Sequence, residues 1–200
     1  PVSNDLKITM LNVGQGDAFL IQTKTQNILI DTSDQDERTK LVNELEKAGV
    51  NSFDKIILTH PHADHIGGVD KILKTCTVKE IYDNGVAATG KLYLNYMKAI
   101  KDSNGAIKHG TLKAGDVVDF GDGAKFEVLA PDKELVDNVN SGKKKTDPNN
   151  ESIVGRLVYK DFTMMFTGDA EIPEEIAILS ANKDNLANLR SRVLKSGHHG

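Results

Sequence analysis

The sequence predicts an α/β protein in which strands and helices pack in layers. Predicted strands and helices are interleaved along the chain, which is typical of layered α/β domains. Apolar residues make up 38% of the 200 residues and aromatic residues only 5%, so the core must be mainly aliphatic. No linker rich in Pro or Ser divides the sequence, and we therefore expect a single domain over residues 1–200.

The first half of the chain is predicted to alternate between short apolar strands and amphipathic helices. The helix over 36–48 is indicated by Leu41, Val42 and Leu45 on one face and by Gly49 as its stop. The strand over 55–59 is an apolar run that leads directly into a histidine-rich segment. The remaining predictions are strands at 6–13, 17–23, 26–31 and 78–82, and helices at 67–74 and 91–102.

The second half is predicted to be mainly β, with one further helix. Gly121-Asp122-Gly123 and Lys160-Asp161 are turn sequences, and each separates two apolar runs. Residues 140–150 form a polar loop. The predicted elements are strands at 116–120, 125–130, 152–159, 162–167 and 192–196, and a helix at 173–181.

Charge and cysteine content exclude several classes of protein. The net charge of −4 gives no general basic footprint for nucleic acid. The single cysteine, Cys76, excludes an internal disulfide and any site with several thiolates, and we expect it to be a packing residue. No apolar stretch approaches the roughly 20 residues that span a bilayer.

The segment His60-Pro61-His62-Ala63-Asp64-His65 holds three of the six histidines and follows a predicted buried strand. His60 and His62 are two residues apart on an extended segment, so they should point the same way. Asp64 and His65 lie at the bend into the next helix and can serve a second ion. The alternative is a solvated loop that is rich in histidine. The pattern predicts a binuclear metal site, with ions about 3.5–4 Å apart.

Other predicted strand ends carry further potential ligands. Asp31 and Asp169 each end or follow a strand, and His198 comes soon after the last one. Strand ends from different parts of a chain can meet at one edge of a sheet, where loops build sites. Imidazole and carboxylate together suit Zn, Mn or Fe, and Asp169 is the natural bridging carboxylate. His109 stands alone, and we interpret it as a surface or packing residue.

These motifs resemble the metallo-β-lactamase superfamily, whose signature is H-x-H-x-D-H. Within it the chain is most similar to the hydrolase-like domain of ComEC-type competence proteins, which serve DNA uptake. The similar blocks are LNVGQGDAFLI (11–21), ILIDTS (28–33), ILTHPHADHIGG (57–68), NNESIVGRLVY (149–159), FTGDAE (166–171) and LKSGHHG (194–200). The resemblance implies a four-layer αββα sandwich with the metals at the edge between two sheets. It also implies further strands after GHHG, so we expect a chain truncated at its C-terminus.

The resemblance implies a role for each matching residue. Asp31 would support the site by hydrogen bonding. Asp64, and His199 through proton sharing or substrate contact, would have catalytic roles, and His198 rather than His199 is favoured as the last histidine ligand. The implied metal ligands are His60, His62, Asp64, His65, Asp169 and His198. The family's further histidine is replaced near Asn149-Asn150, so Asn150, Ser152 or water would complete a weaker site.

The predicted activity is hydrolysis by hydroxide bound to one or two divalent ions. Phosphodiester bonds are the first choice of substrate, with single-stranded DNA as a partner, because the ComEC-type group is associated with DNA uptake. Lys143-Lys144-Lys145 could meet phosphates, although a solubilising loop is the simpler interpretation. Hydrolysis of lactams, lactones or thioesters and a non-catalytic, metal-retaining binding module are the alternatives. The resemblance favours an extracellular or cell-surface location in bacteria.

Overall fold

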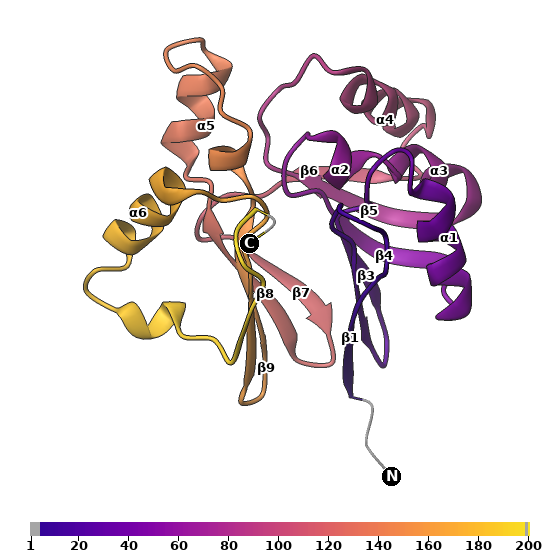
Figure 1. Ribbon diagram of the computed structural model, residues 1–200, viewed down its shortest axis with the longest axis horizontal. Coiled ribbons are helices and arrows are strands. Elements are labelled where there is room, and N and C mark those ends of the chain that lie inside the picture. Colours follow the sequence, from indigo (N-terminus) through magenta and orange to yellow (C-terminus); the bar gives the residue numbers. More distant parts are fainter. Residues whose placement is uncertain (1–4, 199) are drawn as a thin grey trace.

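The computed structural model describes residues 5–198 and residue 200. Two β-sheets face each other, and helices cover the outer face of each sheet (Figure 1). The strand orders are β1-β2-β3-β4-β5-β6 in one sheet and β11-β10-β9-β8-β7 in the other. This arrangement confirms the predicted αββα sandwich.

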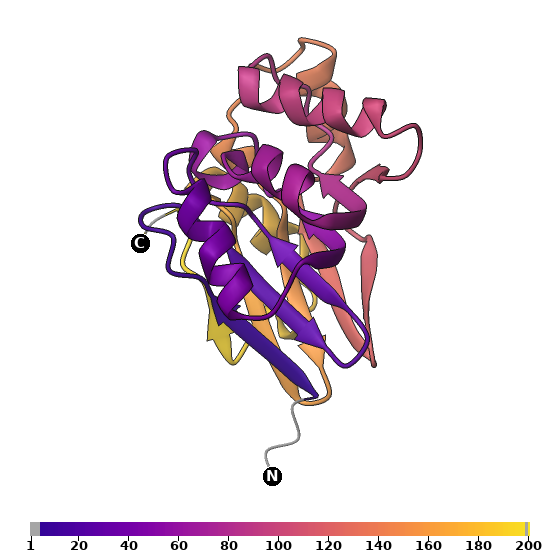
Figure 2. The ribbon, with the colours of Figure 1, turned by 90° about the vertical axis from the view of Figure 1, so that its right-hand side faces the viewer.

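The first sheet combines an antiparallel and a parallel half. Short connections join its first three strands as antiparallel neighbours, whereas helical crossovers make the next pairs parallel. Its strands are β1 (Leu6–Met10), β2 (Phe19–Thr23), β3 (Asn27–Ile30), β4 (Ser52–Ile57), β5 (Thr77–Asp83) and β6 (Lys108–Thr111). The crossover helices are α1 (Arg38–Lys47), α2 (Ala63–Ile66), α3 (Val69–Thr75) and α4 (Lys91–Asp102). Figure 2 shows the helices that lie in front of this sheet.

The second sheet is antiparallel except at its last pair. Strands β7 to β10 pair with antiparallel neighbours, and β11 joins β10 in parallel after the crossover through α6. Its strands are β7 (Val117–Gly121), β8 (Ala124–Ala130), β9 (Val154–Tyr159), β10 (Phe162–Phe166) and β11 (Val193–Leu194). The helices of this half are α5 (Lys133–Asn140) and α6 (Ile172–Ala181), with 3-10 turns η1 (Asn149–Glu151) and η2 (Leu186–Leu189).

The alternation of side chains along the strands divides the core into separate layers. Leu20 and Leu29 face the helices of the first sheet, whereas their neighbours Ile21 and Ile28 face the second sheet. A smaller cluster under α6 includes Met165 and Ile178. Because both faces of β2 and β3 are buried, their sequences are continuous apolar runs.

Several sequence predictions of elements need correction. Strand β6 and helix α5 are present but were not among the predicted elements. The β6 sequence KHGT has no apolar alternation and forms a strand by backbone pairing with β5. Helix α5 is capped by Asp132, whose side chain accepts a hydrogen bond from the Leu135 backbone N–H, and it buries no residue fully. The strand predicted over 192–196 is only Val193–Leu194.

Candidate metal centre

The histidine-rich segment lies at the end of β4, where the chain leaves the first sheet. His60 is buried, with 2% of its surface exposed, and His62 is extended at the start of α2. The Nε2 atom of His60 lies 3.0 Å from the Nδ1 atom of His62. The two imidazoles therefore bring a nitrogen each to one point, as the H-x-H spacing predicts.

His65 projects from α2 between two carboxylates. Its Nδ1 atom lies 2.8 Å from Asp31 Oδ2, and its Nε2 atom lies 3.0 Å from Asp169 Oδ1. The residue is fully buried. Because one ring nitrogen is held by Asp31, the other is directed toward the centre of the cluster.

Asp31 follows β3 and is fixed by the neighbouring strand. Thr59 donates hydrogen bonds to it from its backbone N–H (2.8 Å to Oδ1) and from its hydroxyl (2.8 Å to Oδ2). The backbone of Asp31 has a positive φ of 59°, a conformation that Asp and Asn tolerate better than most residues. These contacts place Asp31 behind His65 as a supporting residue.

Asp169 comes from the second sheet, just after β10, and lies in the middle of the cluster. Its Oδ2 atom is 3.8 Å from His60 Nε2 and 3.6 Å from His198 Nε2. Its backbone N–H donates a 3.1 Å hydrogen bond to Ser152 Oγ. Ser152 is completely buried and positions the Asp169 backbone.

The donor atoms fit a divalent transition metal. One ligand atom each from His60, His65 and Asp169 lies within 4.8 Å of the other two. Two nitrogen ligands of a tetrahedral zinc ion, at about 2.0–2.1 Å each, are roughly 3.3 Å apart, close to the 3.0 Å between His60 and His62. Imidazole and carboxylate suit Zn, Mn or Fe.

Burial and charge shift the proton affinities of the cluster in opposite directions. Burial, together with the neighbouring His65, lowers the pKa of His60 to about 2. Burial disfavours charge on His65 as well, but the carboxylates of Asp31 and Asp169 raise the pKa of His65 to about 10. Asp169 is also desolvated, yet its contact with His65 holds its pKa well below the usual range. A metal ion at this point would have to displace the proton of His65.

The C-terminal segment brings His198 to the same place. His198 has a positive φ of 56°, and its side chain is 51% exposed. Lys195 Nζ donates hydrogen bonds to the backbone carbonyls of Gly168 (2.7 Å) and His198 (2.9 Å), which fixes this turn beside Asp169. His199 lies outside the described residues.

Asp17 and Lys195 lie beside the histidine and aspartate cluster, although neither was predicted as a site residue. Lys195 Nζ lies 2.7 Å from Asp17 Oδ2. Asp17 also forms a second group with Asp31 and His65 whose ligand atoms lie within 4.8 Å of one another. The charged residues inside the VGQGDA and LKSGHHG blocks were the available signal.

The VGQGDA loop is packed against the histidine-rich segment itself. The Asp17 backbone N–H donates a 3.1 Å hydrogen bond to the Asp64 carbonyl. A Cβ atom on Gly16 would lie 2.5 Å from that carbonyl oxygen and 2.7 Å from the Asp34 backbone nitrogen. Gly16 therefore permits a close backbone approach that a side chain at this position would block.

Asn150 is engaged in a different task from the one predicted. Its Oδ1 atom accepts hydrogen bonds from the backbone N–H groups of Glu171 (3.2 Å) and Glu174 (3.3 Å) at the start of α6. Its amide nitrogen donates to Asp147. These bonds do not support Asn150 as a third metal ligand, which stays a prediction.

The remaining candidates lie outside the centre. Lys143, Lys144 and Lys145 are exposed, and Lys144 borders a cavity between α5 and α6. Cys76 packs against the core of the first sheet, as expected. His109 lies in β6, where its Nε2 atom is 2.9 Å from Asp83 Oδ2, which agrees with a packing role.

Among the described residues, no helix is long and apolar enough to cross a membrane.

Two curated bacterial proteins are similar to this chain over nearly its whole length. Competence protein ComA of Neisseria gonorrhoeae is 28% identical over 198 residues, which are 98% of this chain and 24% of that protein. ComE operon protein 3 of Bacillus subtilis is 29% identical over 218 residues, covering 100% of this chain and 26% of that protein. The chain thus spans about a quarter of the length of these relatives.

Solved structures share the fold at low sequence identity. The metallo-beta-lactamase SMB-1, bound to 2-mercaptoethanesulfonate, has a TM-score of 0.59 and 16% identity, covering 96% of this chain and 76% of that chain. The metallo-beta-lactamase fold protein YhfI from Bacillus subtilis has a TM-score of 0.52 and 15% identity, covering 81% of this chain and 62% of that chain.

The family is shown by a match that spans almost the whole sequence. The model of the metallo-beta-lactamase superfamily matches residues 11–199, a range that begins before the VGQGDA loop and includes every strand from β2 onward. This chain therefore belongs to the metallo-beta-lactamase superfamily.

Proposed function

We propose that this chain is a metal-dependent phosphodiesterase that cleaves DNA during its uptake by bacterial cells. The observation that carries the hydrolytic part is the convergence of His60 and His65 on Asp169, with His62 beside His60 and Asp31 behind His65. The phosphodiester part is supported by the similarity to competence protein ComA and to ComE operon protein 3. Single-stranded DNA is the proposed partner, and the cell surface is the proposed location.

We propose two divalent ions, Zn, Mn or Fe, with separate ligand sets. His60 and His62 would hold one ion, whereas Asp64, His65 and His198 would hold the other. Asp169 would bridge them, since its two oxygens face different histidines. When bound, such ions act as Lewis acids and lower the pKa of water from 15.7 to about 7.

The protein's own groups would order the substrate and the proton transfers. Asp64 Oδ2 lies 3.8 Å from His65 Nε2, and its side chain is 27% exposed, so it can both bind metal and orient a nucleophile. His199 is the second proposed catalytic residue, as a proton-sharing or substrate-contacting group. Asp31 and Ser152 would hold His65 and Asp169 in position.

The two sites should differ in strength. The His60 and His62 pair lacks a third histidine, because Asn149 and Asn150 stand where the family has one. The Asn150 side chain accepts hydrogen bonds from the start of α6 instead. We therefore propose that the ion at this pair is held more weakly and exchanges first.

The test is metal-dependent cleavage of bis-p-nitrophenyl phosphate and of single-stranded DNA, with Zn, Mn or Fe added in turn. His62→Ala should abolish cleavage because it removes a proposed metal ligand. The fold should tolerate the change, because His62 is only partly buried. His109→Gln is the matched control, because His109 binds Asp83 outside the centre.

Two results would contradict the proposal. Cleavage that persists in His62→Ala would exclude this centre as its source. Turnover of nitrocefin or a lactone without phosphodiester cleavage would support a hydrolase, but one whose substrate is a lactam or lactone and not DNA.

A further inference from the structure

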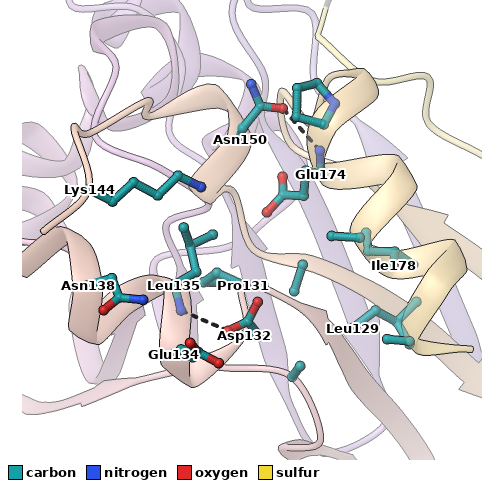
Figure 3. Close-up of a pocket in the computed structure, with 15 residues that line it drawn as sticks. Leu129, Pro131, Asp132, Glu134, Leu135, Asn138, Lys144, Asn150, Glu174 and Ile178 are labelled. Atoms are coloured by element: carbon teal, nitrogen blue, oxygen red, sulfur yellow. Dashed lines mark hydrogen bonds between the residues drawn. The ribbon is translucent and has the colours of Figure 1, made fainter.

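The cavity between α5 and α6 is lined by none of the histidines or aspartates of the candidate metal centre, although Asn150 borders it (Figure 3). Its volume is about 300 Å³. Apolar side chains form its walls, with Leu135 from α5 on one side and Ile178 from α6 on the other, and Pro131 lies between them. Cavities of this size hold small organic molecules.

Glu174 places a carboxylate inside this apolar cavity. The residue lies in the first turn of α6 and is only 4% exposed. Neither carboxylate oxygen accepts a hydrogen bond of good geometry from the described residues, and the Ser152 backbone N–H makes only a weak contact with the carboxylate. Figure 3 shows the carboxylate directed toward the interior of the cavity, between Lys144 and Leu135.

A buried carboxylate in this state is costly for the fold. Without a partner, such a group either neutralises or takes up an opposite charge. Burial raises the pKa of Glu174 to about 9, with Glu151 and Asp147 adding to the shift, while the Ser152 backbone N–H and Lys144 oppose it. Cavities that hold a strongly perturbed acid are candidate binding sites.

The charged residues around the cavity indicate which class of ligand it would bind. Asp132 and Glu134 line it in addition to Glu174, whereas Lys144 is the one basic residue in its described lining. A metal ion is disfavoured, because Glu174 is the only buried carboxylate in the described lining and most of the other lining residues are apolar, whereas Ca²⁺ takes six to eight oxygen ligands. An organic cation can instead place its charge beside Glu174, which releases its proton to solvent as the cation binds. The carbon atoms of the ligand would then lie against Leu135 and Ile178.

We propose that this cavity binds the protonated amine or guanidinium end of a ligand with a short alkyl stem, and that Glu174 is its counter-ion. A paired, desolvated carboxylate forms strong charge-assisted hydrogen bonds with such groups. The stem would be limited to a few methylene groups by the volume of about 300 Å³. The site is independent of metal binding and of the proposed phosphodiesterase activity.

Calorimetry on the whole chain at pH 7 tests this site with two probes of similar shape, n-pentylamine and 1-pentanol. The amine should bind at least tenfold more tightly than the alcohol. Glu174→Gln should lose at least tenfold in affinity for the amine and keep its affinity for the alcohol. Equal affinities for the two probes in the unchanged protein, or an unaltered amine affinity in Glu174→Gln, would overturn the proposal.

Further variants keep the test independent of folding defects. Ala177→Leu fills the cavity from α6 while keeping the Glu174 carboxyl group, and it should weaken both probes. Lys144→Gln removes the competing cation and should leave amine binding unchanged or tighter; loss of binding would contradict the proposed charge pairing. Agmatine and a lysine-containing peptide, compared in the same way, distinguish a free small amine from a basic side chain.

Discussion

The Oδ2 atom of Asp31 lies 2.8 Å from the Nδ1 atom of His65, and both residues are buried. This contact joins the end of β3 to α2 and leaves His65 Nε2 facing Asp169. The same carboxylate is held by Thr59, so the imidazole is oriented by a support that is itself fixed. Such supporting contacts determine how well a histidine binds metal.

Asp31→Asn should weaken metal binding by about 10- to 100-fold, the usual cost of losing a support for a histidine ligand. Asn tolerates the positive φ of 59°, so the backbone should be retained. Competition with a chromophoric chelator would measure the change. Asp36→Asn is the control, because Asp36 is exposed, and an unaltered affinity in Asp31→Asn would remove Asp31 from its supporting role.

Lys195→Met should destabilise the fold by about 1–3 kcal/mol, since it removes the ion pair of Asp17 with Lys195 and releases three backbone carbonyls. It should also lower metal stoichiometry, because the His198 turn loses its anchor. Denaturant unfolding and elemental analysis would measure the two effects. Adding Asp17→Asn should recover part of the lost stability, whereas simple additivity of the two changes would show that the pair is not coupled.

Gly16→Ala should destabilise the protein by about 1–3 kcal/mol, as overpacking usually does. The added Cβ atom would lie 2.5 Å from the Asp64 carbonyl oxygen, so the shift would reach the histidine-rich segment. Gly90→Ala is the matched control, because a Cβ atom there meets nothing within 4 Å. Thermal unfolding would compare the two, and equal losses would contradict the close approach at Gly16.

The stability of the protein should fall as the pH rises, through Glu174. Its pKa rises from 4.5 to about 9 on folding, so the folded state holds the proton across that window and the unfolded state does not. This contribution is complete below pH 4.5 and is lost toward pH 9. Glu174→Gln should remove the loss, on the order of a few kcal/mol at the upper end. Denaturant unfolding at several pH values would show the difference, and parallel profiles would exclude it.

Elements with a strong apolar pattern could be predicted from the sequence, and weakly patterned ones could not. Helix α4 occupies the predicted residues 91–102, because its apolar positions repeat with the helical period. Strand β6 was missed because its pairing with β5 uses backbone groups, which any sequence offers. Helix α5 was missed because it buries no residue fully, so its sequence carries no strong core signal.

The sequence by itself determined the superfamily resemblance and the H-x-H-x-D-H segment, because spacing within a few residues fixes the local geometry of His60 and His62. Only the tertiary structure decided what surrounds it. In the folded chain, Asp17 and Lys195 pair beside the candidate metal centre, and the Asn150 side chain is hydrogen-bonded to the start of α6. Glu174 lies in the cavity between α5 and α6. These relationships join residues that are far apart in the chain, and their distances depend on how the two sheets pack, which no local spacing encodes.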